Sequence, residues 1–231
     1  DNVTDLSLDK IPFDRLKKTK ELLIYGYGSD GCVSASKSLI KIVGDNTNKY
    51  VQGYFQYDSK KSGGVTISHL RFSDKMIRST YYISKPNFLV ITKDNYLEKY
   101  DIVTDIEENA TLLINTDKGP DVVKLMKPSF INMLVNKNVK TYVIDANKLA
   151  SEYNFKNKIS MIIESAIFSI ANIIPYDLAI LEMKKSIENK FSKKGQDIVK
   201  TNIKLVEETK NYIKEIKLEK TEQKDIIKNE S

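Results

Sequence analysis

The feature that most constrains this chain is its alternation of short β-rich apolar runs with longer segments of helical periodicity. Such alternation is typical of α/β proteins rather than of all-helical or all-strand folds. Runs separated by short turns predict an antiparallel meander, and runs separated by helical segments predict parallel strands. The strand-like runs are residues 22–27, 50–58, 65–72, 77–83, 88–92, 111–116 and 141–146, of which the second, third and fourth form the predicted meander. The helical segments between them are residues 32–43, about 95–103 and 121–136.

From residue 147 onward the pattern is almost wholly helical. Residues 159–174 are apolar on nearly all sides, which predicts a buried helix. Pro175 separates it from a helix over residues 176–191, and an apolar stripe that runs as far as Ile216 predicts a final helix. We therefore expect an α/β fold: a three-layer Rossmann-like domain with a mixed sheet and a helical C-terminal part. The predicted domain is residues 1–210, followed by a helix end and polar linker at 211–231.

Composition limits the class of partner. The chain has 231 residues, with 37 Lys and Arg against 31 Asp and Glu, a balance too even for a dedicated nucleic-acid binder. No apolar run approaches the ~20 residues of a membrane span, and no secretion signal opens the sequence, so we expect a cytoplasmic protein without a membrane partner. The single cysteine, Cys32, excludes an internal disulfide and any all-cysteine metal or iron–sulfur site in this chain.

Three glycines form a G-x-G-x-x-G motif directly after the first strand-like run. The glycines are Gly26, Gly28 and Gly31. In this position the motif favours close approach of a phosphate to a helix N-terminus, as in dinucleotide-binding folds. The acidic partner expected of such folds is ambiguous, because Asp45 falls in a predicted loop and Asp58 lies too far along. A plain strand-to-helix turn, or a turn facing another ligand or a domain interface, remains an alternative.

A basic loop, "YDSKKSGG", lies between two of the strand-like runs. Lys60 and Lys61 stand beside Ser62 and Gly63, where side-chain charge and bare backbone N–H groups could hold phosphate oxygens. The chain contains no G-K pair, which excludes a Walker A loop. The alternative is a solvated basic hairpin turn.

Other polar residues carry less specific signals. His69, the one histidine, is predicted to be a hydrogen-bonded structural residue rather than a base. Arg71 and Arg78 could hold an anion bidentately or form a salt bridge to a neighbour such as Asp74. Aromatic side chains at 50–57 alternate between faces, which disfavours a base-stacking nucleic-acid platform. We identify no catalytic residue and no metal site in this chain.

Several blocks resemble a known enzyme family. "GDNT", "QGYFQYDSKKSGGVTISHLRF" and "IRSTY" are similar to one segment of the pyruvate:ferredoxin (flavodoxin) oxidoreductase family, in the domain equivalent to the gamma subunit of the 2-oxoacid oxidoreductases. "DNVTDLSL", "NKISMIIESAIFSIANIIPYDLAI" and "KKGQDIV" extend the resemblance over residues 1 to about 210. It departs over 117–140, where the chain reads "DKGPDVV" and lacks the proline–tryptophan pair common in the family.

The resemblance implies a parent enzyme that converts pyruvate and CoA to acetyl-CoA and CO2, with ferredoxin or flavodoxin as electron acceptor. It implies thiamine diphosphate, Mg2+ and [4Fe–4S] clusters held by other domains or subunits, so this chain alone is expected to be inactive. Lys60 and Lys61 become candidates for the CoA phosphates, with Ser62, Gly63 and Arg78 as further candidates. Two alternatives remain: an interaction module without its own ligand, and a Rossmann-type NAD binder.

Overall fold

The computed structural model describes residues 19–27, 30–57, 64–155 and 159–222 of the chain. Within them, the strand-like and helical runs predicted from the sequence are largely present. The strands are β1 (Lys20–Tyr27), β2 (Tyr50–Tyr57), β3 (Val65–Ser73), β4 (Phe88–Ile91), β5 (Thr111–Asn115), β6 (Lys140–Ile144) and β7 (Lys214–Ile216). The helices are α1 (Cys32–Asn46), α2 (Tyr96–Lys99), α3 (Pro128–Asn136), α4 (Ala146–Glu152), α5 (Ser160–Ile170), α6 (Tyr176–Phe191) and α7 (Gln196–Glu208).

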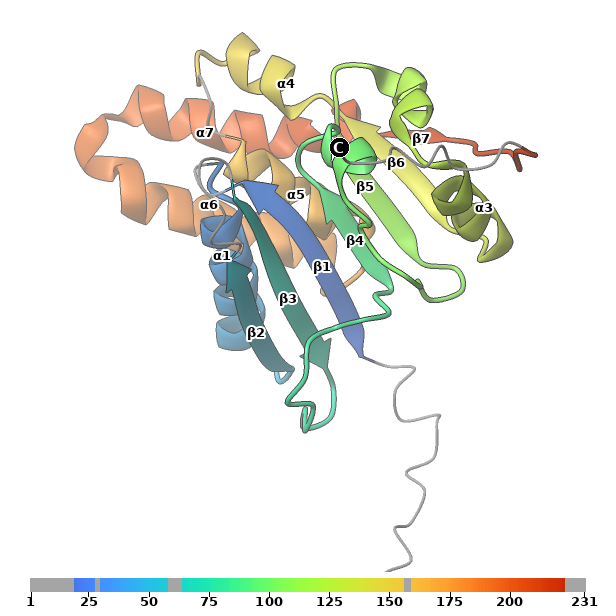
Figure 1. Ribbon diagram of the computed structural model, residues 1–231. Coiled ribbons are helices and arrows are strands. Elements are labelled where there is room, and N and C mark those ends of the chain that lie inside the picture. The colour runs from blue at the N-terminus through green and yellow to red at the C-terminus, as the bar shows by residue number, and fades with distance from the viewer. Residues whose placement is uncertain (1–18, 28–29, 58–63, 156–158, 223–231) are drawn as a thin grey trace, which may run out of the picture.

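The strands form one mixed sheet in the order β2-β3-β1-β4-β5-β6-β7 (Figure 1). β1, β4, β5 and β6 are parallel, whereas β3 runs antiparallel to both β1 and β2, and β7 runs antiparallel to β6. The predicted mixed-sheet α/β fold is therefore confirmed. The chain leaves β1 toward β2 on one side and places β4 on the other, which makes the gap between β1 and β4 a topological switch point.

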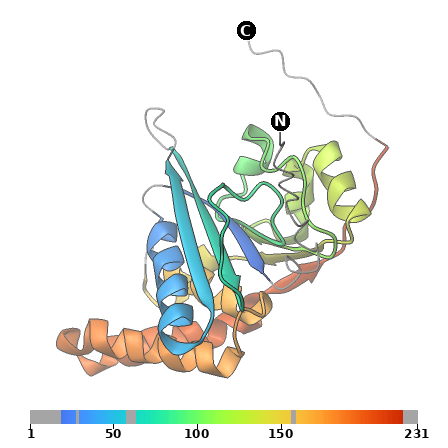
Figure 2. The same cartoon turned by 90° about the horizontal axis from the view of Figure 1, so that it is seen from below.

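Each face of the sheet carries its own apolar core, as the alternation of side chains along a strand requires. Leu22 and Ile24 of β1 pack with α1, α5, α6 and α7, while Leu23 and Tyr25 pack with residues of α2 and α3. Figure 2 shows the blue and orange helices on one side of the sheet and the green helices on the other. None of the described helices has both the length and the apolar character needed to cross a membrane.

The predicted strand at residues 77–83 is wrong, because this segment is irregular. The place beside β3 that a third meander strand would occupy is taken by β1. The segment instead crosses the outer face of β2 and β3, where side chains satisfy its backbone. Gln52 Nε2 donates to the carbonyl of Ser79 at 2.7 Å, and Arg71 Nη1 donates to that of Tyr81 at 2.9 Å.

The predicted final helix also ends earlier than expected. α7 stops at Glu208, a short 3-10 turn follows at Thr209–Tyr212, and the chain then adds β7 to the edge of the sheet. Ile216, assigned to the helix by its spacing, is a buried strand residue that packs on the α3 face. The sheet therefore includes β7, within the residues that were expected to form a helix end and polar linker.

Candidate functional site

The carboxyl ends of the parallel strands meet at one edge of the sheet, the usual ligand-binding edge of open α/β folds. Because β3 is antiparallel, its first residue, Val65, lies at this edge too, paired with Tyr27 at the end of β1. The last residue of β2, Tyr57, pairs with Thr66 beside it. The basic loop therefore leaves and re-enters the sheet at the carboxyl edge. Its residues Lys60, Lys61, Ser62 and Gly63 lie outside the described residues.

The turn from β1 into α1 is held by a carboxylate that sequence analysis missed. Asp30 accepts hydrogen bonds from the backbone N–H of Tyr27 at 2.7 Å and of Cys32 at 2.8 Å. It also accepts from Thr92 Oγ1 at 2.9 Å, which ties the turn to the end of β4. An Asp directly before a Gly is a sequence signal for a turn in which the carboxylate accepts from the N–H two residues on, and it could have identified this role.

Two glycines of the G-x-G-x-x-G motif serve packing. A Cβ on Gly26 would stand 2.7 Å from the Cβ of Cys32, so the strand and helix approach too closely for a larger residue. Gly31 has φ of 81°, in the left-handed region, and a Cβ there would lie 3.0 Å from Ser160 of α5. Gly28 lies outside the described residues. β3 separates β1 from β2, so the adjacent parallel pair that a Rossmann-type NAD site requires is missing.

A lysine faces the switch point at this edge. The Nζ of Lys93, just after β4, lies 3.7 Å from the centre of the Tyr27 ring, a cation–π contact. No described carboxylate forms an ion pair with Lys93, whereas Lys118 pairs with Asp94 at 2.8 Å. Lys93 is therefore a cation available to an anionic ligand beside the point where the basic loop rejoins the sheet.

A polar hollow of about 300 Å³ opens between the ends of β4 and β5. Thr116 Oγ1 and Lys118 Nζ both donate to Asp94 Oδ2, each at 2.8 Å. Partial burial alone would raise the pKa of Asp94, but these hydrogen bonds outweigh it and lower the pKa overall. Asn115 bridges the carbonyl of Thr92 and the N–H of Ala146, so the wall of the hollow is largely satisfied by its own groups.

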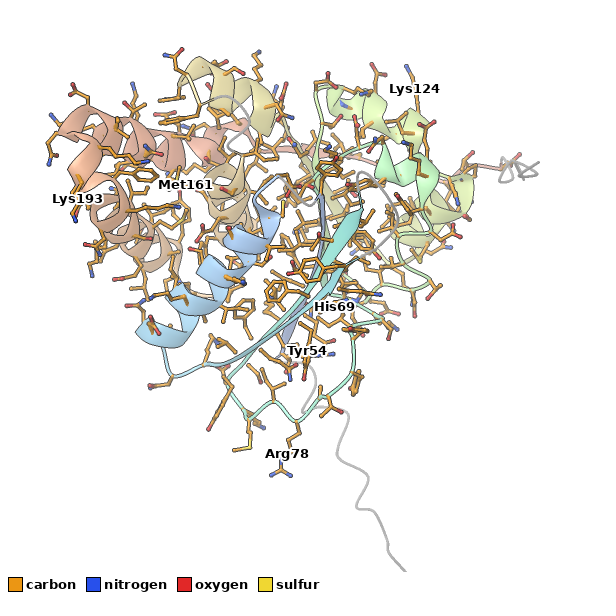
Figure 3. The ribbon with its side chains drawn as sticks, turned by 60° about the vertical axis from the view of Figure 1, so that its left-hand side comes forward. Tyr54, His69, Arg78, Lys124, Met161 and Lys193 are labelled. Carbon is orange, nitrogen blue, oxygen red and sulfur yellow. The ribbon has the colours of Figure 1, made fainter. Side chains whose placement is uncertain are left out.

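Arg78 lies at the other edge of the sheet. It follows β3, whereas the basic loop precedes it, and the nine residues of β3 span roughly 27 Å. Arg78 is exposed and points away from the body of the domain (Figure 3). The structure thus separates Arg78 from the strand ends that flank Lys60 and Lys61.

His69 is a structural residue, as expected. Its Nδ1 accepts from the N–H of Ile83 at 3.1 Å, and its ring stacks on Tyr82 with centroids 4.6 Å apart. Burial, with the nearby charge of Arg71, lowers the pKa of His69 to about 4, so the ring is neutral at pH 7. Arg71 itself is buried and bonds Glu21 at 2.6 Å rather than the predicted partner Asp74, which pairs with Lys49.

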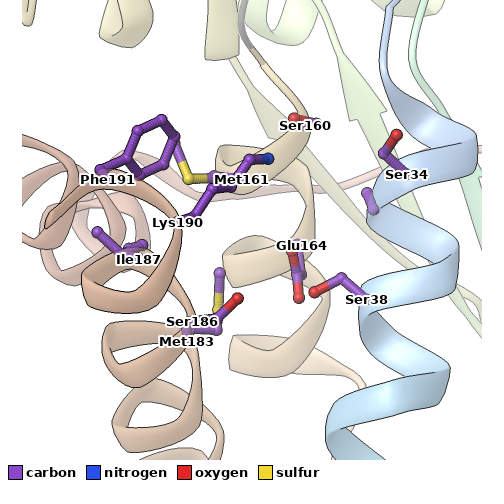
Figure 4. Close-up of a pocket in the computed structure, with 11 residues that line it drawn as sticks. Ser34, Ser38, Ser160, Met161, Glu164, Met183, Ser186, Ile187, Lys190 and Phe191 are labelled. Atoms are coloured by element: carbon purple, nitrogen blue, oxygen red, sulfur yellow. The ribbon is translucent and has the colours of Figure 1, made fainter. Parts of the chain in front are cut away.

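A buried carboxyl lies on the helical side of the sheet. Glu164 of α5 faces a cavity of about 70 Å³ between α1, α5 and α6 (Figure 4). Burial raises the pKa of Glu164 to about 8, although Ser38 and Lys190 partly counteract it. Its Oε1 has no hydrogen-bond partner among the described residues. A single Glu within an apolar run gave no sequence signal for this environment.

The described residues do not fit a resident metal or cluster. They contain no group of three His, Cys, Asp or Glu side chains that could hold a metal ion. Cys32 is buried, and burial with the nearby Asp30 carboxylate raises its thiol pKa, which disfavours the thiolate that metal ligation requires.

Comparison with known proteins identifies close relatives. Residues 21–212 match the family model described as "Pyruvate ferredoxin/flavodoxin oxidoreductase". A pyruvate-flavodoxin oxidoreductase of Trichormus variabilis is 41% identical over 219 residues, which are 94% of this chain and 18% of that protein. A pyruvate dehydrogenase (NADP+) of Cryptosporidium parvum is 39% identical over 207 residues, 89% of this chain and 11% of that protein. The chain thus spans a fifth or less of the length of these relatives.

A solved structure shares the fold. The pyruvate oxidoreductase subunit PORC of Thermotoga maritima superposes with a TM-score of 0.68 at 22% identity. The match covers 87% of this chain and 99% of the subunit. The same fold therefore occurs as a separate polypeptide.

Proposed function

The chain belongs to the pyruvate ferredoxin/flavodoxin oxidoreductase family, and from that membership we propose that it is one domain of a larger enzyme that oxidises pyruvate. The enzyme would convert pyruvate and CoA to acetyl-CoA and CO2 and pass two electrons to an acceptor. This domain would bind part of CoA and form interfaces with other domains, and it would be inactive alone. The buried free thiol of Cys32 is compatible with a reducing, cytoplasmic location.

Thiamine diphosphate, Mg2+ and the [4Fe–4S] clusters belong, in this proposal, to other parts of the enzyme. The donor set of the described residues supports that division, because the one thiol is buried and faces a carboxylate. The electron acceptor does not follow from this segment. Relatives of similar identity are named for flavodoxin and for NADP+, so the acceptor would be determined outside this domain.

CoA is the ligand best suited to the carboxyl edge. The observation that carries the proposal is the meeting of three features: the strand ends that flank Lys60 and Lys61, the switch point of the sheet, and Lys93 over Tyr27. CoA carries three phosphate groups, and charge-assisted hydrogen bonds to phosphate are about twice as strong as neutral ones. Ser62 and Gly63 would add hydroxyl and backbone donors. Arg78 is not part of this site, because the length of β3 separates it from the flanks of the loop.

The test is steady-state kinetics of the full-length enzyme. We expect Lys60→Ala and Lys61→Ala each to raise the KM for CoA roughly tenfold, the value of one lost charge-assisted contact. Lys93→Ala should raise the KM for CoA by a smaller factor, about threefold, because in the wild type the Lys93 charge is shared between the ligand and the Tyr27 ring. Dephospho-CoA should bind more weakly than CoA to the wild type.

Lys193→Ala with Lys194→Ala is the matched control. These exposed lysines follow α6 on the helical side, so the double variant loses two positive charges, one more than each single variant, without touching the strand ends that flank the basic loop. The CoA proposal is overturned if CoA and dephospho-CoA are used equally well and the loop variants keep the wild-type KM. An interaction module without its own ligand would then be the better description.

A further inference from the structure

At the end of the sheet formed by β2 and β3, one face is left without a helical cover. In β2, Gly53 and Phe55 contact α1. Because side chains alternate along a strand, the other face of β2 points away from α1. It carries Tyr50, Gln52, Tyr54 and Gln56. The irregular segment 74–87 is the described element that crosses this outer face. Its backbone is fixed there by Gln52, His69 and Arg71.

Large side chains gather on the outside of this cover. Tyr81 is 60% exposed, Tyr82 is 52% exposed and Met76 is 63% exposed. Tyr82 contacts the half-buried Tyr54 edge to face at 6.3 Å between ring centroids, and Tyr50 lies two residues before Gln52 on the same face. We call this surface the tyrosine patch. It consists of Tyr50, Tyr54, Met76, Tyr81 and Tyr82, and exposed Arg78 lies on the same segment as Met76, Tyr81 and Tyr82.

The segment is fixed to the sheet from its inner side, by hydrogen bonds from three sheet side chains to its backbone, by stacking of Tyr82 on His69 and by contact of the Tyr81 ring with Arg71. More than half of the surface of Tyr81 and of Tyr82 nevertheless stays exposed, and this surface is available to a partner. A contiguous apolar patch is typical of an interaction site.

The composition of the patch indicates a protein partner. Tyr, Met and Arg are enriched in the buried centres of protein interfaces, where tyrosines supply large contact area at a small cost in conformational entropy. Two exposed cations, Lys75 and Arg78, lie on the segment, so a complementary surface would present carboxylates around apolar sockets. More than four fifths of the length of the Trichormus relative lies outside the region that this chain matches.

We propose that the tyrosine patch is the surface on which this domain docks against a neighbouring domain of the same parent enzyme. Arg78 would anchor the contact through a carboxylate of that domain. This inference rests on the proposed function, since it assigns the domain interface that the function requires. It is separate from the CoA site, which lies at the carboxyl edge of the sheet.

Hydroxyl-radical footprinting of the full-length enzyme tests the proposal. Tyr81, Tyr82 and Met76 should be labelled roughly fivefold more slowly than their exposure in the domain alone would allow, because an interface core is desolvated. Arg78→Glu should restore labelling of Tyr82 and Met76, whereas Lys193→Glu, the same charge reversal on the helical side, should not. Tyr81→Ser, a change at an exposed position, provides a second variant with the same expected direction.

Each outcome decides the question. Full labelling of the patch in an active enzyme overturns the docking surface while leaving the CoA proposal intact. Protection that disappears on dilution, as copies separate, overturns it in favour of a second copy of the chain. Protection that is unchanged in Arg78→Glu and Tyr81→Ser, with wild-type association of the domain, also overturns it. A KM for CoA measured on the same preparations reports separately on the carboxyl edge.

Discussion

The central strands of the sheet and the end formed by β2 and β3 are covered by different means. The central parallel strands lie between helices on both faces, and their cover is an apolar core of fully buried side chains such as Leu113 and Ile163. β2 and β3 have α1 on one face, but the other face is covered by an irregular segment held through Gln52, His69 and Arg71. One cover depends on buried apolar area and the other on a few hydrogen bonds to buried polar groups.

The difference has consequences for how each region responds to change. Apolar packing loses stability gradually as atoms are removed, and it is insensitive to pH. A polar network fails when one member is removed, because the remaining buried groups lose their partners. Among the buried polar residues of the helical side is a carboxyl group, Glu164, which gives this side a titratable group of its own.

Removing the centre of the polar cover should have the largest effect. Arg71 is 1% exposed and bonds Glu21, Gln52 and the Tyr81 carbonyl. Arg71→Ala should lower the free energy of unfolding by about 4 kcal/mol, because breaking a buried pair leaves the partner charge uncompensated. Denaturant unfolding of the wild type and the variant measures the difference.

A surface pair at the same end is the control for Arg71. Lys49 and Asp74 form an ion pair that is partly exposed to solvent. Lys49→Ala should change the free energy of unfolding by less than about 1 kcal/mol. Equal losses in the two variants would mean that burial of the Arg71 network does not stabilise the cover.

The sequence predicted the helix-covered end better than the polar one. The alternation of apolar runs with helical segments predicted β1, β4, β5 and β6. These strands are buried on both faces, and burial requires the apolar residues that such a pattern detects. The β-rich composition of residues 77–83 could not show that β1 occupies the neighbouring position on β3, since strand pairing is not encoded locally. Ile216 fitted a helical stripe and a short strand equally well. Spacing alone could not choose between them.

The candidate site was predictable in its motif but not in its geometry. The glycine motif and the basic loop were identified, yet the packing role of Gly26 depends on the distance to Cys32 in a folded chain. The Asp30–Gly31 pair is typical of a turn held by its own carboxylate, but the bond from Asp30 to Thr92 depends on the folded chain. Lys93 gave no signal, because its importance comes from contact with Tyr27 across the switch point.

On the helical side, Glu164 should make stability fall as pH rises. Its folded pKa is about 8 and its ordinary value is 4.5, so between these values the folded state holds a proton that the unfolded state has lost. Folding stability therefore decreases across that window, by roughly 3 kcal/mol between pH 5 and pH 7. Glu164→Gln, a neutral group of the same shape, should remove this decrease. Unfolding curves of both proteins from pH 5 to pH 8 measure it, and parallel pH profiles would contradict the assignment.

At the polar end, His69 should act in the opposite direction and more weakly. Its folded pKa is about 4 and its ordinary value is 6.5, so below pH 6.5 the unfolded state takes up a proton that the folded state refuses. The stability that the neutral ring contributes is present above pH 6.5 and is lost as pH falls toward 4. Between pH 6.5 and pH 5 the loss amounts to roughly 2 kcal/mol.

The His69 variant should separate this titration from the loss of a contact. In His69→Asn, the amide oxygen can replace Nδ1 as the acceptor for the Ile83 N–H, but it cannot titrate. The variant should be less stable than wild type at pH 7, because it loses the stacking on Tyr82, and the difference should narrow as pH falls to 5. A difference that stays constant with pH would show that His69 is charged or exposed in the folded state. The segment that carries the tyrosine patch would then be less tightly fixed to the sheet than its hydrogen bonds indicate.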